Sequence, residues 1–442
     1  MHHMRMIKIV LPVLLVFCSS GIWATDYDLT SYLKKVEKDN ADLVLARKDL
    51  TSAQEGVVRA RSALLPSVAV QGSYNRNFKD ITQPMPVAAP SGGGPLIYKD
   101  IDTNYDNELT LALNVNQTVF NATSLAMYQQ AKTTLAMQQK VFEATRQSIL
   151  GAAKKLYAQT QLATKALSVW EASEQTAHEV YTYTEMKYKA GVMKELDFLM
   201  AEVDWKSKIP AVDDARKNAE LAMIALKNLA GIPLSETVNL TEKMENIPPL
   251  PQEKTVDEIL GARPDYAAMI LAKNLADLAL KSAYGSYLPT VSASFLYAYA
   301  DYGNGSSFTD KEVPASKINV TATIPLFAGG YRNSLVKSAL IEKEKSDIKI
   351  AQKRDTIERD LTEVQLRMAK AQKSIESTKV QLVAAQKAHD LAVASYTNGV
   401  ATQLTVSQAA TQYDQAQLAV YNALYEYRAA YYDWEIITGQ IQ

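Results

Sequence analysis

Residues able to do catalytic chemistry are few in this chain and stand apart from one another. Its 442 residues include four histidines. His178 and His389 each lie alone in a long helical pattern, without the His-Glu-x-x-His spacing that puts two zinc ligands on one helix face. His389 and Asp390 are adjacent, so their side chains would point to different sides of a helix, and we interpret them as surface residues. The histidines predict neither a metal site nor a catalytic centre.

Phosphate chemistry and nucleic-acid binding are not indicated either. The run Gly92-Gly93-Gly94 lies between prolines, whereas a phosphate-binding loop follows a strand and opens a helix. The sequence has no Gly-x-x-x-x-Gly-Lys-Ser/Thr motif, and its net charge of −1 gives no reason to expect nucleic acid as a partner. We therefore expect a protein that is not an enzyme and that uses no cofactor.

The N-terminus has the pattern of a secretory signal. Arg5 and Lys8 precede the apolar run 9–17, and Ala24 ends a plausible cleavage site, so residues 1–24 are expected to be removed. Cys18 is the one cysteine of the chain and lies inside this segment, which leaves the mature chain without a disulfide or a catalytic thiol. Lipidation of Cys18 is the alternative.

The rest of the chain repeats itself at an offset of 208 residues. Tyr188 and Gly191 recur as Tyr396 and Gly399 (396 − 188 = 399 − 191 = 208), and a valine follows each glycine. We expect both glycines to break long helices. A long internal repeat predicts one structural plan used twice.

Each copy has the order helix, strand, loop, strand, long helix, break, helix. The predicted domains are a first repeat at 25–231, a linker at 232–262 and a second repeat at 263–442. The predicted elements are a helix from about 28 to 64, strands 66–77 and 107–120, helices 122–190 and 192–230, then a helix, strands 289–301 and 317–327, and helices 329–398 and 400–437. The proline-rich segment 77–106 and the segment 301–316 are expected to be loops, and the aromatic segment 425–434 is expected to pack near the linker.

The predicted strands alternate between apolar and polar residues. Leu109, Leu111 and Leu113 would share one face, and Thr110 and Asn114 the other. Such alternation suits a transmembrane barrel with an apolar exterior and a wet lumen, and no apolar run is long enough for a transmembrane helix. Four strands cannot close a barrel, because small barrels need about eight; three chains would supply twelve.

The long helices extend this interpretation. About 69 residues of helix span roughly 100 Å, so twelve helical segments from three chains would form a duct leading away from the barrel. The fold class expected is therefore mixed α+β, internally duplicated, with four strands per chain in a trimeric transmembrane barrel. The alternative is a soluble or lipid-anchored periplasmic coiled-coil scaffold, with a small four-stranded sheet in each monomer.

Several short motifs, in order along the chain, resemble one family. They are Leu65-Pro66 and Leu288-Pro289 before strands, Arg263-Pro264-Asp265 at the second repeat, Pro325 to Gly330 after the last strand, and the two Tyr-x-x-Gly-Val breaks. With the signal sequence and the duplication, they make the chain similar to the TolC-like outer membrane efflux proteins. This resemblance implies a homotrimer, a twelve-stranded barrel in the lipid of a bacterial outer membrane and an α-helical periplasmic tunnel. It also implies an exit duct for efflux or type I secretion that docks to a periplasmic adaptor and an inner-membrane transporter of the RND or ABC class.

The resemblance implies a gate as well. The breaks at Gly191 and Gly399 become the far periplasmic tips, and the family's closing bond from an aspartate to a tyrosine falls on Asp197 and Tyr396. Two simpler roles stay open. Asp197 could be a solvated residue favoured by the helix dipole, and Tyr396 could pack at the tip.

Three positions depart from the family pattern. Ala401 takes the place of the arginine that would complete the latch. Thr405 and Gln408 take the places of two acidic residues that form a cation-selective ring in the best-known member. The charged half of the latch and the acidic ring of this repeat are therefore not expected here.

Overall fold

The computed structural model describes residues 25–79, 81–88, 94–306 and 311–441. The predicted signal sequence with Cys18 lies outside the described residues, and so do Gly92 and Gly93. Two compact units are present. The helical unit contains the described chain up to Val44, Arg146–Glu253 and the chain from Leu361 onward; the sheet unit contains Leu45–Thr145 and Lys254–Asp360. Each unit combines segments of both predicted repeats.

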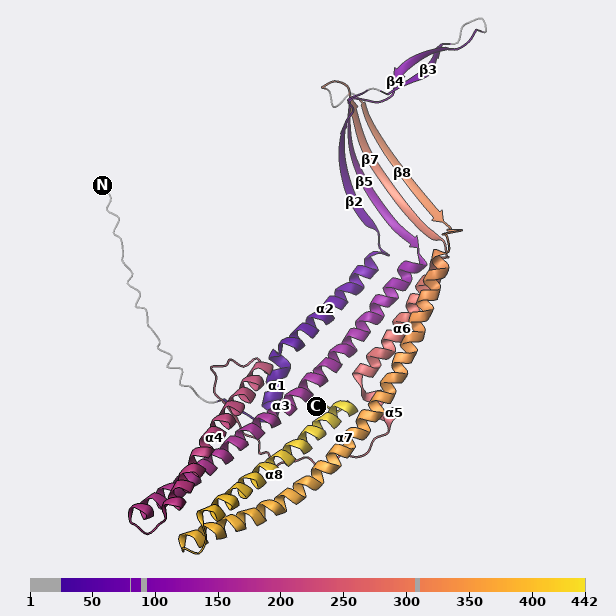
Figure 1. Ribbon diagram of the computed structural model, residues 1–442. Helices are drawn as coiled ribbons and strands as arrows, with labels where there is room; N and C mark the ends of the chain where they lie inside the picture. Colours follow the sequence, from indigo (N-terminus) through magenta and orange to yellow (C-terminus); the bar gives the residue numbers. More distant parts are fainter. Residues whose placement is uncertain (1–24, 80, 89–93, 307–310, 442) are drawn as a thin grey trace, which may run out of the picture. The chain divides into compact units, whose positions relative to one another are not determined.

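The sheet unit is built on one antiparallel sheet with the order β2-β5-β7-β8 (Figure 1). Its strands are β2 (Ser67–Arg76), β5 (Asn107–Phe120), β7 (Thr290–Gly303) and β8 (Lys311–Thr323). The central pair, β5 and β7, joins the first repeat to the second. The strands β2 and β8 lie at the two edges.

The bounds predicted for the last strand, 317–327, are wrong. Strand β8 begins at Lys311 and ends at Thr323, because its pairing with β7 runs from Lys311↔Tyr302 to Thr323↔Thr290. Pro314 lies within it. Proline lacks the N–H that a central strand needs, but β8 is an edge strand, where one row of N–H groups has no partner in the sheet.

The expectation of an irregular loop at 77–106 is also wrong. This segment contains the antiparallel pair β3 (Thr82–Ala88) and β4 (Ile97–Asp102), drawn beyond the ends of β2 and β5 in Figure 1. Prolines 84 and 86 both pair with β4, and the register shifts between Pro86 and Ala88. A two-stranded ribbon consists of edge strands, so it accepts prolines that would disrupt a wider sheet.

Cross-strand partners form rows, and successive rows lie on opposite faces of the sheet. One row of partners across all four strands is apolar: Val68, Val115, Phe295 and Ile318. The next row, on the other face, is polar: Ser67, Asn116, Ser294 and Asn319. The sheet therefore has two faces of different chemistry, as the alternation in the sequence predicts.

Ion pairs join helices of the sheet unit that follow the linker: α5 (Val256–Ala262), α6 (Pro264–Gly285) and the first part of α7 (Tyr331–Thr397). Three pairs between α6 and α7 have N–O distances of 2.6–2.8 Å: Lys273–Asp347, Lys343–Asp277 and Lys353–Asp265. Charged residues of α7 therefore form ion pairs with α6, in addition to those that face solvent.

The helical unit contains most of the remaining elements. They are β1 (Thr25–Tyr27), α1 (Leu29–Asp39), α4 (Glu195–Leu229), β6 (Val238–Leu240), α8 (Gln403–Thr438) and the later parts of α3 (Ala122–Lys189) and α7. The predicted helix 28–64 is instead two helices, α1 and α2 (Ala41–Ser62), because Asn40 between them is extended. The Asn40 side chain accepts from Leu43 N at 3.1 Å and donates to Leu229 O at 2.9 Å, which starts α2 and ties it to α4. Within the described chain, no helix is long and apolar enough to cross a bilayer.

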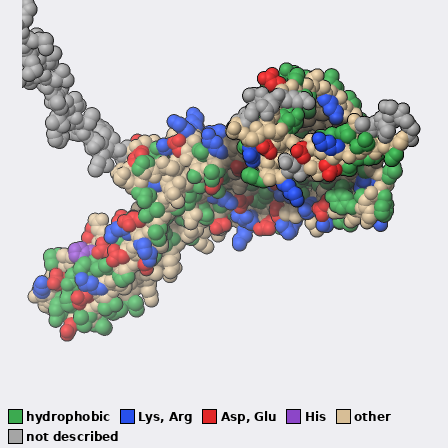
Figure 2. Space-filling model, turned by 90° about the horizontal axis from the view of Figure 1, so that it is seen from above, with side chains coloured by type: hydrophobic (Ala, Val, Ile, Leu, Met, Phe, Trp, Pro, Cys, Tyr) green, Lys and Arg blue, Asp and Glu red, His purple; other side chains and the backbone are tan. Residues whose placement is uncertain are grey.

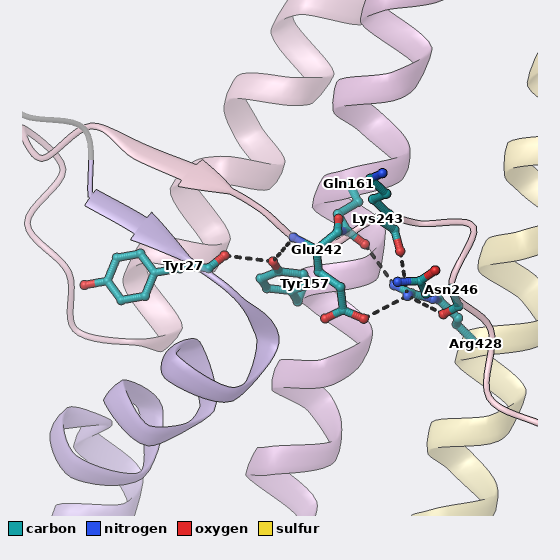
Figure 3. Close-up of polar contacts among 7 residues, drawn as sticks. All are labelled: Tyr27, Tyr157, Gln161, Glu242, Lys243, Asn246 and Arg428. Atoms are coloured by element: carbon teal, nitrogen blue, oxygen red, sulfur yellow. Dashed lines mark hydrogen bonds and ion pairs between the residues drawn. The ribbon is translucent and has the colours of Figure 1, made fainter.

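The aromatic segment 425–434 packs against the linker, as predicted. The Tyr427 hydroxyl donates to the carbonyl oxygen of Pro248 at 2.9 Å. Arg428 is 1% exposed, and its guanidinium holds the linker through Glu242 at 2.9 Å and the carbonyl oxygens of Lys243 and Asn246 at 3.1 and 2.7 Å (Figure 3). It also donates to Gln161 of α3 at 3.0 Å, so one buried cation joins α8, α3 and the linker.

Candidate functional site at the helix turns

The two predicted breaks are turns with the same backbone geometry. Gly191 and Gly399 have φ of 73° and 75°, a left-handed conformation that other residues adopt at an energetic cost. In the first turn, Val192 N donates to Lys187 O at 3.0 Å and Gly191 N to Tyr188 O at 2.9 Å. This pair of bonds is the Schellman motif, which satisfies the last carbonyls of a helix.

The second turn repeats both bonds. Val400 N donates to Ser395 O at 2.8 Å, and Gly399 N donates to Tyr396 O at 3.0 Å. Helices α4 and α8 begin at Glu195 and Gln403, three residues later than the predicted starts at 192 and 400, because the chain needs these residues to leave the turn. The glycines act on the backbone, and no atom of the described residues lies within 4 Å of a Cβ built on either one.

The surroundings of the first turn are open. The Tyr188 ring is 37% exposed and stacks on Phe198 of α4, with centroids 5.1 Å apart and planes 6° apart. Met186, Val192 and Leu196 are also exposed, and hydrophobic side chains lie among charged ones at the left end of Figure 2. The first turn therefore presents apolar side chains at the surface of the chain.

At the second turn the tyrosine itself is buried, although Val400 and Leu404 are 84% and 49% exposed. Tyr396 is 6% exposed and packs with Ala392 and Val406 in an apolar cluster. Its hydroxyl lies 2.8 Å from Thr184 Oγ1 of α3. Thr184 already donates its own hydroxyl proton to Val180 O at 2.8 Å, so Tyr396 is the donor and Thr184 the acceptor. Burial raises the pKa of Tyr396, and the nearby charge of Asp197 adds to the increase.

Asp197 lies in the first turn of α4 and is half-buried. It is near enough for its charge to act on Tyr396, but among the described residues no hydrogen bond joins the two. The structure therefore gives the Tyr396 hydroxyl to Thr184, and the predicted bond to Asp197 is not among the hydrogen bonds of the described residues. No sequence signal pointed to Thr184, since it lies 212 residues from Tyr396 and its repeat counterpart is Ala392 (392 − 184 = 208).

The three positions that depart from the family pattern carry uncharged side chains, and the structure shows where each one lies. Ala401 packs against the apolar cluster around Tyr396. Thr405 helps to start α8, because Thr402 Oγ1 accepts from Thr405 N at 3.4 Å and the two hydroxyl oxygens are 3.0 Å apart. Gln408 is exposed.

The two histidines pack on aromatic rings. His178 lies 4.5 Å from the Trp205 ring, and His389 stacks on Tyr413 at 5.4 Å, both measured between centroids. His389 is half-buried rather than fully on the surface. In the part of the chain that the structure describes, no three His, Cys, Asp or Glu side chains are grouped so as to hold a metal ion.

A groove of about 330 Å³ lies between α4 and α8 just beyond the turns. Its lining is largely apolar, with Leu199, Met200, Val203 and Leu404, and Ser207 and Ser407 add hydroxyl groups. The groove and the two turns belong to the helical unit, so the site is one continuous region at the end of this unit.

Known proteins resemble the chain along nearly its whole length. The outer membrane efflux protein family matches at residues 32–232 and 255–439. Outer membrane protein TolC of Escherichia coli strain K12 is 21% identical over 432 residues, which cover 95% of this chain and 84% of TolC. Outer membrane efflux protein BepC of Brucella suis biovar 1 is 22% identical over 423 residues, which cover 96% and 87% of the two chains.

A solved structure has the same fold. The Campylobacter jejuni CmeC outer membrane channel superimposes with a TM-score of 0.75 at 18% identity, covering 93% of this chain and 85% of CmeC. The family is one of transport channels rather than enzymes. Since the family match takes in both repeats, both turns and the sheet, the chain belongs to the outer membrane efflux protein family, as an outer-membrane efflux channel that extends into the periplasm.

Proposed function

We propose that three copies of the chain form one passive exit duct. Their four-stranded sheets would close into a twelve-stranded barrel in the outer membrane, and their helical units would form a tunnel in the periplasm. Through an adaptor, an inner-membrane transporter of the RND or ABC class would send small molecules or proteins into the duct and supply the energy.

The observation that carries this proposal is the two-faced sheet. One row of cross-strand partners is apolar, and it consists of Val68, Val115, Phe295 and Ile318. The next row along the strands is polar, and its side chains lie on the opposite face. Val68, Phe295 and Ile318 are exposed in the single chain. A lipid-facing surface needs such apolar residues, and a water-filled lumen needs the serines and asparagines. The alternative of a soluble scaffold would leave this apolar face in water.

The sheet edges support closure by further copies. Strand β2 is parallel to β7 and β8 is antiparallel to β7, so β2 and β8 are antiparallel to each other. The β8 edge of one chain could therefore pair with the β2 edge of the next in the antiparallel sense, through the part of β8 after Pro314. Closure would remove the unpaired edges, which cannot persist in lipid.

The turns supply the periplasmic end of the duct in this proposal. Asp197 and Tyr396 form the gate region, with Thr184 as the acceptor that holds the tyrosine. The groove between α4 and α8 is lined by Leu199, Val203 and Leu404, which suits the apolar face of an adaptor helix.

Membrane fractionation with gel mobility tests the proposal directly. The protein should sediment with outer membranes and migrate as a trimer in unheated detergent samples, and as a monomer after boiling. Reconstituted into planar bilayers, it should form ion-conducting channels. A monomer confined to the soluble periplasmic fraction would rule out the barrel.

A further inference from the structure

Helix α8 buries both polar and apolar side chains, and two polar ones lie in its first part. Gln403 is 1% exposed and Asp414 is also buried. Beyond them, the buried residues Ala423, Leu424 and Tyr427 belong to an apolar cluster. The first part of α8 thus buries an amide and a carboxylate beside the apolar Val406, whereas the second part combines this apolar cluster with the buried contacts of Arg428.

The polar contacts of the first part run to α3 and α4. Lys208 Nζ lies 3.1 Å from Asp414 Oδ2, and Ser173 donates to the same oxygen at 2.5 Å. The Lys208 and Asp414 side chains are 10% and 9% exposed. Nearer the turn, Ser407 donates to Asp204 Oδ1 at 2.7 Å. Buried charges are tolerated when they are paired and hydrogen-bonded, as here.

A cavity of about 70 Å³ lies among these groups. Its lining includes Ser173, Thr176, Asp204, Lys208, Gln403 and Asp414, together with His389, Tyr413, Gln417 and several apolar side chains. The Gln403 side-chain oxygen is buried and has no hydrogen-bond partner among the described residues. A buried acceptor of this kind is strongly destabilising unless a donor reaches it, so the cavity requires a ligand that donates.

A water molecule matches both the volume of this cavity and the polar groups that line it. A buried water needs about 10–15 Å³ of cavity volume and two to four polar partners. Gln403 Oε1 and the carboxylates of Asp204 and Asp414 can accept hydrogen bonds from such a water, and the lining also has donor groups that could bind its oxygen. We propose that the cavity is a binding site for ordered water, which donates to Gln403 Oε1 and links it to the Lys208–Asp414 pair.

Bound water would also affect the gate, and this step rests on the proposed function. Separating the start of α8 from α3 and α4 would expose groups that are already hydrated. Separating the later part would expose Leu424 and Tyr427 to water, which opposes opening. The segment from Gln403 to Asp414 is then the part of α8 that opens most readily.

The first test is a structure of the assembled wild-type protein in lipid nanodiscs, at a resolution that shows water. Solvent density should lie within about 3 Å of Gln403 Oε1. Gln403→Met keeps the shape without the acceptor and should lose that density, whereas Gln408→Met, an exposed site on the same helix, should keep it. A Gln403 amide bonded to a protein group, or a cavity without ordered solvent, would overturn the proposal.

The second test is amide hydrogen exchange of the same assembly. Lys208→Met combined with Asp414→Leu removes the buried ion pair and makes the cavity less polar. Exchange at 403–414 should slow by about tenfold, while exchange at 423–434 stays unchanged. Unchanged exchange at 403–414 would contradict a hydrated cavity between α8 and the helices α3 and α4. Both readouts are independent of conductance, so a hydrated protein that conducts no ions would count against the proposed function and not against the water site.

Discussion

The turns at Gly191 and Gly399 share one backbone geometry and differ in how the preceding tyrosine packs. Both have the same two Schellman bonds and nearly equal φ angles. Tyr188 precedes the first turn and is 37% exposed, whereas its repeat counterpart Tyr396 is 6% exposed and bonded to Thr184. The partner position differs too, with Phe198 stacked on Tyr188 and Val406 packed on Tyr396 (406 − 198 = 208).

This difference shows what a duplication preserves. A turn built on a left-handed glycine depends on backbone bonds within a few residues, so both copies retain it. Side-chain contacts across the bundle depend on neighbours far away in sequence, so each copy has its own. Asp197 in the first copy corresponds to Thr405 in the second, which caps a helix instead (405 − 197 = 208).

Truncating the two tyrosines should give the largest difference in stability between the two turns. Tyr396→Ala removes a buried ring and its hydrogen bond, and we expect it to lower the local free energy of opening by about 3 kcal/mol. Tyr188→Ala removes a partly exposed ring and should lower it by about 1 kcal/mol. Amide exchange around each turn measures both values. Equal losses at the two turns would mean that the burial of Tyr396 does not distinguish them.

Substituting alanine for each glycine should cost the two turns the same free energy, because both depend on the same backbone geometry. Gly191→Ala and Gly399→Ala should each destabilise the local turn by about 1–2 kcal/mol, because alanine is strained at positive φ. Steric contact adds nothing at either position. The control is Gly56→Ala in α2, where a Cβ also meets no atom; there alanine should stabilise the helix by up to about 1 kcal/mol. A clear difference between the two turns would contradict a purely backbone role.

Removing single polar groups tests whether Tyr396, Thr184 and Asp197 form the proposed gate. Tyr396→Phe deletes its hydrogen bond to Thr184, worth about 1 kcal/mol or about fivefold in an opening equilibrium. Thr184→Val deletes that bond and also the bond from Thr184 to Val180 O within α3. Asp197→Ala combined with Tyr396→Phe should raise single-channel conductance in planar bilayers. The matched control, Tyr188→Phe in the open turn, should leave conductance unchanged. If neither Thr184→Val nor the double variant changes it, these residues do not form the gate.

The smallest effect we expect is a loss of stability of the second turn at high pH. Burial raises the pKa of Tyr396 above the unfolded value of about 10, so the protonated tyrosine stabilises the folded turn. This contribution is fully present below pH 10 and is lost as the pH rises through the higher folded value. Amide exchange at the second turn should therefore accelerate more steeply above pH 10 in the wild type than in Tyr396→Phe. Identical pH profiles would show that the hydroxyl does not contribute.

Much of the architecture followed from local patterns. Glycine at 191 and 399, long stretches without proline, and the two-residue period of Leu109, Leu111 and Leu113 each act through neighbouring residues, so they could be read without a structure. The hairpin β3–β4 and the start of β8 could not. Prolines 84, 86 and 314 argued against strands there, and only the edge positions of those strands make the prolines acceptable.

The sequence by itself determined the repeat, the helix breaks and the two-faced strands, because each depends on backbone propensity or on a short period. Tertiary structure alone decided which of the two tyrosines is buried, that Tyr396 donates to Thr184 across 212 residues, and that Lys208 and Asp414 line the same cavity as the buried oxygen of Gln403. These contacts join helices whose side chains have no fixed relation until the bundle packs, so no local pattern could reveal them.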